Sequence, residues 1–110
     1  MPTAANRVED RTPLRVTVDL SSVDVRLPAR EGITENVSAH GARVVVSEAL
    51  PRELRLNVRS MLGSLRSRAR VVYCENLTNG LFAVGLELFA TAGEWILPGS
   101  MPATPPGKPA

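Results

Sequence analysis

The sequence predicts an all-β domain, folded as an antiparallel sandwich or barrel. Short segments alternate apolar and polar residues, which is the pattern of strands that bury one face against a core. Gly, Pro, Asn and Ser cluster between these segments and mark turns. No segment of helix length carries an amphipathic helical pattern. The strands must therefore cover one another's apolar faces, as they do in a closed or double sheet.

The first expected strand covers 16–20, where Val16, Val18 and Leu20 share one face and the residues between them are polar. Residues 23–27 alternate in the same way, and they either continue this strand or pair with it. Pro and Gly within 27–32 predict a turn there.

The central stretch 34–46 is expected to form a strand, a tight turn and a second strand, because β-branched residues at both ends suit a pleated surface. Ser38, His40 and Gly41 interrupt that β-branched pattern. Gly41 can take φ > 0 without steric cost, and it lets another backbone or a ligand come close. Asn36 and Ser38 have the same parity, so their side chains leave on one face and, beside Gly41, form a floor suited to a small polar ligand.

The second half of the chain predicts three further strands separated by turns. The strands are expected at 54–59, 65–73 and 82–89. The turns are expected at 61–64 and at 75–80, where Asn79-Gly80 is a strong hairpin signal. Trp95, Ile96 and Leu97 are then expected to pack back onto the sheet.

The strand at 65–73 carries a stripe of arginines. Its odd-numbered residues, Tyr73 included, are expected to face the core, which leaves Arg66, Arg68 and Arg70 together on the other face. Such a stripe is usually a solvated face, and its functional interpretation is a secondary contact with an anionic ligand or partner.

Length and composition indicate one domain with an extension at each end. The 110 residues, 44% of them hydrophobic, suffice for a single core. Residues 1–10 are polar and lack periodicity, so we expect a flexible N-terminal arm. Residues 98–110 are rich in proline, and we expect a disordered tail. The domain itself is therefore assigned to 11–97.

The charges are nearly balanced, but the choice of basic residue is unusual. The formal net charge of +2 does not predict a nucleic-acid coat. All of the 13 basic residues except Lys108 are Arg, whose planar fork suits phosphates and guanine edges. A GC-rich genome is the simpler explanation of this bias.

The single cysteine, Cys74, cannot form an internal disulfide and fits a reducing compartment. The N-terminus shows no apolar signal-peptide region, and no apolar run approaches the ~18 residues of a membrane span. We therefore expect a cytoplasmic protein that does not contact a membrane.

The spacing Asn36-x-Ser38-x-x-Gly41 resembles the [Asp/Asn]-x-Ser-x-x-Gly signature of the PilZ domain, a small bacterial β-barrel receptor for cyclic di-GMP. The family pairs this signature with Arg-x-x-x-Arg just before the first strand, where Arg11 and Arg15 stand here. The arginine spacing recurs elsewhere in this Arg-rich chain, so the specificity comes from the combination with the signature and the all-β pattern.

Residues 83–89 are also similar to the closing strand of the PilZ family. The resemblance then covers residues 11–95. It implies a small six-stranded antiparallel PilZ-type β-barrel, which is more specific than the sandwich or barrel that periodicity predicts.

The resemblance also implies a cyclic di-GMP site formed by the N-terminal arm and the central turn. Its expected ligand-binding residues are Arg11, Arg15, Asn36, Ser38 and Gly41, with secondary contacts from Arg7, His40 and Arg70. Arginines would bond phosphate oxygens or guanine edges and stack on the bases, whether the ligand is one molecule or a stacked dimer. The arm would order over the ligand and so change the surface that a partner protein meets.

Glu9 and Asp10 depart from the family pattern, in which a further Arg often precedes the first motif arginine. Their carboxylates either pair with the arginines or repel phosphates. A degenerate PilZ-like interaction module that binds no nucleotide therefore stays open as the alternative. A barrel that binds single-stranded nucleic acid through the arginine stripe is a third candidate, but the chain's 4% of aromatic residues provides few stacking platforms.

Enzymatic chemistry is not expected. The sequence shows no carboxylate pair and no nucleophile–base set that stands out. His40 is the only histidine, and Cys74 alone does not complete a metal site with it. We expect no cofactor besides the ligand, and an output that passes through a downstream protein partner; a homodimer is left open.

Overall fold

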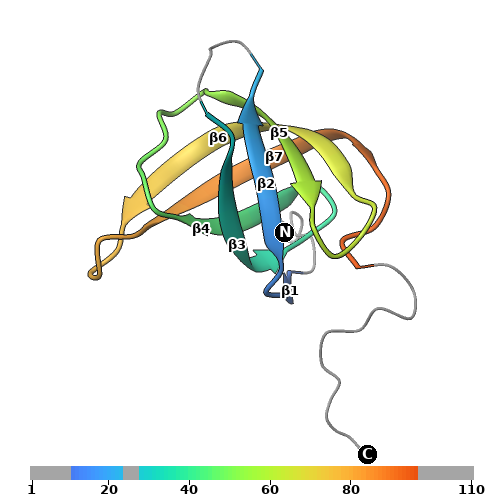
Figure 1. Cartoon of the computed structure of the whole chain (residues 1–110), viewed down its shortest axis with the longest axis horizontal. Coiled ribbons are helices and arrows are strands. Elements are labelled where there is room, and N and C mark those ends of the chain that lie inside the picture. The colour runs from blue at the N-terminus through green and yellow to red at the C-terminus, as the bar shows by residue number, and fades with distance from the viewer. Residues whose placement is uncertain (1–10, 24–27, 97–110) are drawn as a thin grey trace, which may run out of the picture.

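All regular secondary structure in the described part of the chain is β-strand (Figure 1). The computed structural model describes residues 11–23 and 28–96. Its strands are β1 (Thr12–Pro13), β2 (Thr17–Ser22), β3 (Arg30–Val37), β4 (Gly41–Val46), β5 (Arg55–Ser60), β6 (Arg66–Asn76) and β7 (Phe82–Ala92). Within the described residues there is no helix that could cross a membrane.

The strands close into a six-stranded antiparallel barrel, as the resemblance implies. Hydrogen-bonded neighbours follow the order β3-β2-β5-β6-β7-β4, and β3 also pairs with β4 to complete the ring. Closure gives each of these strands a partner on both sides. The short β1 runs along β3 ahead of β2, with Thr12 opposite Val37 and Pro13 opposite Asn36. This pairing carries the N-terminal segment to the end of β3.

Branched aliphatic side chains fill the barrel interior. The largest fully buried ones are Val18, Leu20, Val44, Val58, Val71 and Val84. Each contributes roughly 1.5–3 kcal/mol by leaving water. Thr34 is also fully buried, and its hydroxyl is satisfied because it accepts from Val16 N at 2.9 Å and donates to Leu14 O. Thr34 thereby fastens the segment between β1 and β2 to β3.

Register shifts between paired strands change which side chains face outward. β6 and β7 shift register between Val71 and Tyr73, so Tyr73 lies opposite Gly85 and is 39% exposed. The expectation that Tyr73 faces the core is therefore wrong, because one extra residue reverses the parity of all that follow. A second shift lies in β3 between Thr34 and Asn36.

Two strands also extend into segments that the local sequence predicts to be turns. β3 begins at Arg30, so residues 30–32 belong to a strand and not to a turn, with Gly32 paired to Val18 and buried. β6 continues to Asn76, and the hairpin loop closes through Leu77 N donating to Leu81 O at 2.9 Å. In both places pairing with a neighbouring strand overrides the local turn signal.

The residues after β7 return to the barrel. Trp95 and Ile96 pack against the core, and Ser60 Oγ donates to Trp95 O at 2.6 Å. Residues 1–10, 24–27 and 97–110 lie outside the described residues. The expected arm, the expected strand at 23–27 beyond Val23, the contact of Leu97, the tail and the domain limits thus stay predictions.

Candidate functional site

The segment before β1 lies beside the turn that joins β3 to β4. Arg11 Nη1 donates a 2.7 Å hydrogen bond to Asn36 Oδ1, which joins residues 25 positions apart in the sequence. The β1–β3 register makes this bond possible because it sets Pro13 opposite Asn36. The two regions that the resemblance assigned to one ligand therefore meet in space.

The turn itself is a tight polar corner. Ser38 N donates to Gly41 O at 2.8 Å, and Leu88 N donates to His40 O at 2.8 Å, so the turn is tied to β7. Gly80 and Gly93 are the described glycines with positive φ, and Gly41 is not among them. A Cβ on Gly41 would instead lie 3.3 Å from Leu86 O and 3.4 Å from Ser38 Oγ. Close approach to β7, and not a left-handed backbone, is the reason for glycine here.

A shallow pocket of about 220 Å³ opens beside this corner. Four of the predicted residues line it, namely Arg11, Ser38, His40 and Gly41. Its other walls come from β4, β6 and β7 through Ala42, Val72, Tyr73, Gly85, Leu86 and Glu87. The pocket thus brings together the N-terminal segment, the turn and the middle of the long β6–β7 pair.

Tyr73 forms an aromatic wall of this pocket. Its ring lies on Gly85, where any Cβ would collide with the ring atoms. Arg43 Nη1 donates to Tyr73 Oη at 3.0 Å, and the guanidinium lies 5.9 Å from the ring centroid. The same Arg43 bonds Glu35 at 2.6 Å and Glu75 at 2.9 Å. These contacts hold the ring in place while leaving part of it accessible to a ligand.

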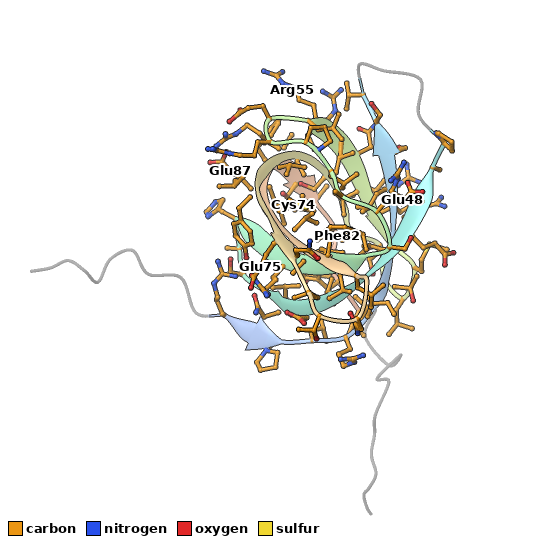
Figure 2. The ribbon with its side chains drawn as sticks, turned by 90° about the vertical axis from the view of Figure 1, so that its left-hand side faces the viewer. Glu48, Arg55, Cys74, Glu75, Phe82 and Glu87 are labelled. Carbon is orange, nitrogen blue, oxygen red and sulfur yellow. The ribbon has the colours of Figure 1, made fainter. Side chains whose placement is uncertain are left out.

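Glu87 places a carboxylate on the pocket wall, and Arg70 neutralises it. Arg70 Nε and Nη2 donate to Glu87 Oε1 at 3.0 and 2.8 Å, while Nη1 donates to Glu53. Figure 2 shows Glu87 on the outside of the barrel, whereas Cys74 and Phe82 lie toward the interior. The ion pair reduces the repulsion that an anionic ligand would meet from Glu87.

Both arginines of these clusters are held in their charged form. The hydrogen bond to Tyr73, followed by those to Glu35 and Glu75, raises the pKa of Arg43. The hydrogen bonds to Glu87 and then Glu53 raise the pKa of Arg70.

In the described residues no group of three or more His, Cys, Asp and Glu side chains could hold a metal ion. The site therefore offers guanidinium, hydroxyl, backbone and aromatic groups, which suit a planar anionic ligand.

The model of the PilZ domain family matches residues 5–94. The chain belongs to the PilZ domain family. PilZ domains are generally receptors for cyclic di-GMP, and they are binding domains that are not typically enzymes. A comparison with curated proteins gave no match.

In this PilZ domain, Asn36 contributes to the pocket indirectly, through its hydrogen bond with Arg11. Asn36 does not line the pocket, but it holds Arg11, which does. Asn36 and Ser38 flank the buried Val37, which agrees with the outward direction predicted for both side chains. The two polar residues of the signature thus have different positions, one behind Arg11 and one at the pocket wall.

The remaining predicted residues lie farther from the pocket. Arg15 is exposed on the segment between β1 and β2 and does not line the pocket. Arg70 contacts the pocket only through Glu87. Arg7 lies outside the described residues.

Tyr73, Gly85 and Arg43 belong to this site although the sequence did not predict them there. Gly85 interrupts an apolar strand, and an isolated glycine there can signal the close approach of another group. That signal points to a neighbour above Gly85 without naming Tyr73. The identity of the neighbour depends on the β6–β7 register.

Proposed function

We propose that this PilZ domain is a receptor for cyclic di-GMP. The observation that carries the proposal is the 2.7 Å bond between Arg11 and Asn36, which joins the two motif regions beside one pocket. Family membership supports the same ligand class. The pocket is smaller than the ~300–1,000 Å³ typical of sites that enclose a drug-sized ligand. A dinucleotide would therefore lie across it, with one base inserted.

Each lining group has a role in this proposal. The guanidinium of Arg11 donates to a phosphate oxygen or to O6 and N7 of guanine. Ser38 contacts a polar edge of the ligand, and Gly41 leaves room for it. The partly exposed ring of Tyr73 stacks on a guanine base, an interaction worth ~1–3 kcal/mol per base in other nucleotide complexes.

The number of bound ligands depends on Arg15 in this proposal. Arg15 is exposed and does not line the pocket, and we assign it to contact with a second cyclic di-GMP stacked on the first. We propose further that the ligand orders residues 1–10, since they directly precede Arg11. Two-dimensional NMR of the full chain tests this step, and arm resonances that do not move at saturation would overturn it.

The proposed output is a change in the surface that a downstream protein partner meets, without catalysis by this domain. We propose a bacterial cytoplasmic setting, which suits the free thiol of Cys74. The competing function is the interaction module without nucleotide, which Glu9 and Asp10 favour because their carboxylates precede Arg11.

Calorimetric titration with cyclic di-GMP decides between the two functions. We expect binding by the unmodified protein, and at least about tenfold weaker binding by Arg11→Ala, because a charge-assisted hydrogen bond is lost. Arg55→Ala is the matched control, since Arg55 is exposed on β5 and does not line the pocket. Absence of heat with the unmodified, folded protein would favour the interaction module.

A further inference from the structure

A second concave surface lies on the outer face of β2, β5, β6 and β7. It shares no lining residue with the pocket described above, which Arg11, Ser38, His40 and Gly41 line. It encloses about 720 Å³ and is the larger of the two. Arg59, Arg66 and Arg68 supply its positive charge. Phe89 lines it as well, with 40% of its surface exposed. We call this surface the arginine face.

The shape of the arginine face is built into the sheet. β6 and β7 shift register where Arg66 and Arg68 lie opposite Ala92 and Phe89. Ala90 takes a left-handed backbone with φ of 54°, which is disfavoured for a residue with a Cβ. Such bulges increase strand twist, and Ser67 Oγ secures this one by bonding Phe89 O at 3.0 Å. The concavity is thus a property of paired strands.

Its charges are not balanced internally. Arg59 lies directly opposite Arg66 in the β5–β6 register, and like charges in such pairs repel. Asp19 is the carboxylate near Arg59, at 3.4 Å. Arg66 and Arg68 have no carboxylate partner within residues 11–23 and 28–96. A negatively charged partner would relieve this repulsion.

We propose that the arginine face binds an extended acidic segment of a partner protein. Arg66 and Arg68 leave the same side of β6 about 6.6 Å apart along the strand. This spacing matches carboxylates at alternate positions of an extended peptide. Phe89, opposite Arg68, then offers an apolar contact to the next side chain on that face of the peptide.

A protein segment fits this face better than nucleic acid does. Single-stranded nucleic acid is bound by rings that stack on successive bases, and Phe89 is the aromatic residue of this lining. The whole chain also carries a formal charge of only +2. The proposal goes beyond nucleotide sensing and does not depend on it, since the two surfaces have separate linings.

NMR titration of the full chain with the acetylated peptide Thr-Glu-Thr-Glu-Thr-Leu tests the proposal. We expect shifts that cluster at Arg66, Arg68 and Phe89 and that weaken as salt shortens the Debye length from ~10 Å at 0.1 M to ~3 Å at 1 M. In Arg66→Ala/Arg68→Ala the affinity falls about fivefold or more, since two ion pairs are lost. Arg55→Ala also removes an arginine, but one that does not line the arginine face, and this variant is expected to keep its affinity for the peptide. Circular dichroism verifies that the variants fold.

Several outcomes would overturn the proposal. Equal shifts with the peptide in which Lys replaces Glu would show that charge is not recognised. Tighter binding of an oligothymidylate to the same residues would assign the face to nucleic acid. Shifts at these residues that depend on protein concentration without peptide would assign it to self-association. Unchanged peptide affinity in Arg66→Ala/Arg68→Ala would place the contact elsewhere.

Discussion

The ring of Tyr73 lies on the backbone of Gly85, directly across the β6–β7 pair. Glycine is required beneath the ring because a Cβ would overlap it. The contact covers a position that lacks a side chain, as aromatic residues do beside glycines in other sheets. It also fixes the position of the ring that forms the aromatic wall of the pocket beside Arg11, with Arg43 donating a hydrogen bond to the hydroxyl.

Gly85→Ala is expected to displace the Tyr73 ring and destabilise the fold by about 1–3 kcal/mol, the usual cost of overpacking. Urea denaturation measures this loss. The control is a double-mutant cycle with Tyr73→Ala, because removal of the ring removes the collision. If Gly85→Ala costs as much without the ring as with it, the contact is not the reason for glycine.

Arg43→Lys is expected to destabilise the protein by about 0.5–1.5 kcal/mol, because an ammonium lacks the planar fork that bonds Glu35, Tyr73 and Glu75 together, while water can replace part of the lost contacts at these partly exposed partners. Arg59→Lys is the control. It affects a single, longer contact of 3.4 Å, and surface pairs of that kind contribute ~0–1 kcal/mol. Equal losses of stability for the two variants would contradict this role of Arg43.

The loss of unfolding free energy caused by Arg43→Met should not change between about pH 6 and about pH 9. The pKa of Arg43 is raised in the folded protein, chiefly by its hydrogen bond to Tyr73, so its contribution to stability is fully present below the unfolded pKa and is lost only at strongly alkaline pH, as the pH rises through the folded pKa. Urea denaturation at several pH values checks this. If the loss of stability in Arg43→Met declined steadily across the neutral pH range, another titrating group would control the contacts of Arg43.

Asn36→Ala is expected to weaken cyclic di-GMP binding about fivefold, although Asn36 does not line the pocket. The amide oxygen positions Arg11, so its loss frees the guanidinium. Asn36→Asp should retain binding because a carboxylate accepts the same hydrogen bond more strongly. Calorimetry on Arg11→Ala/Asn36→Ala supplies the control, and a double variant as weak as Arg11→Ala alone is expected. Additive losses would indicate that Asn36 contacts the ligand itself.

Arg66→Glu is expected to stabilise the fold by about 0.2–1 kcal/mol, since it replaces the repulsion from Arg59 by attraction across β5 and β6. Thermal unfolding measures the gain. Arg68→Glu is the matched control, because Arg68 lies opposite Asn57 and not opposite a cation. A larger gain from Arg68→Glu would show that net charge, and not the opposed pair, sets the effect.

The alternation of apolar and polar residues predicted most strands because it reports locally which face of a strand is buried. It failed at Tyr73, where the extra residue of a bulge reversed the two faces. It also failed at residues 30–32, where Gly32 is paired with Val18 although local sequence signals a turn. Bulges and register depend on the partner strand, which local periodicity does not contain.

The sequence by itself determined the all-β class, the motif spacing from Asn36 to Gly41 and the predominance of arginine among the basic residues. The tertiary structure alone decided that Arg11 reaches Asn36, that Tyr73 covers Gly85, and that Arg59 faces Arg66. Arg11 and Asn36 are 25 positions apart, whereas the other two contacts cross pairs of neighbouring strands, and all three depend on the register in which the strands pair. Spacing along the chain sets which side chains are available, whereas closure of the sheet sets which of them meet.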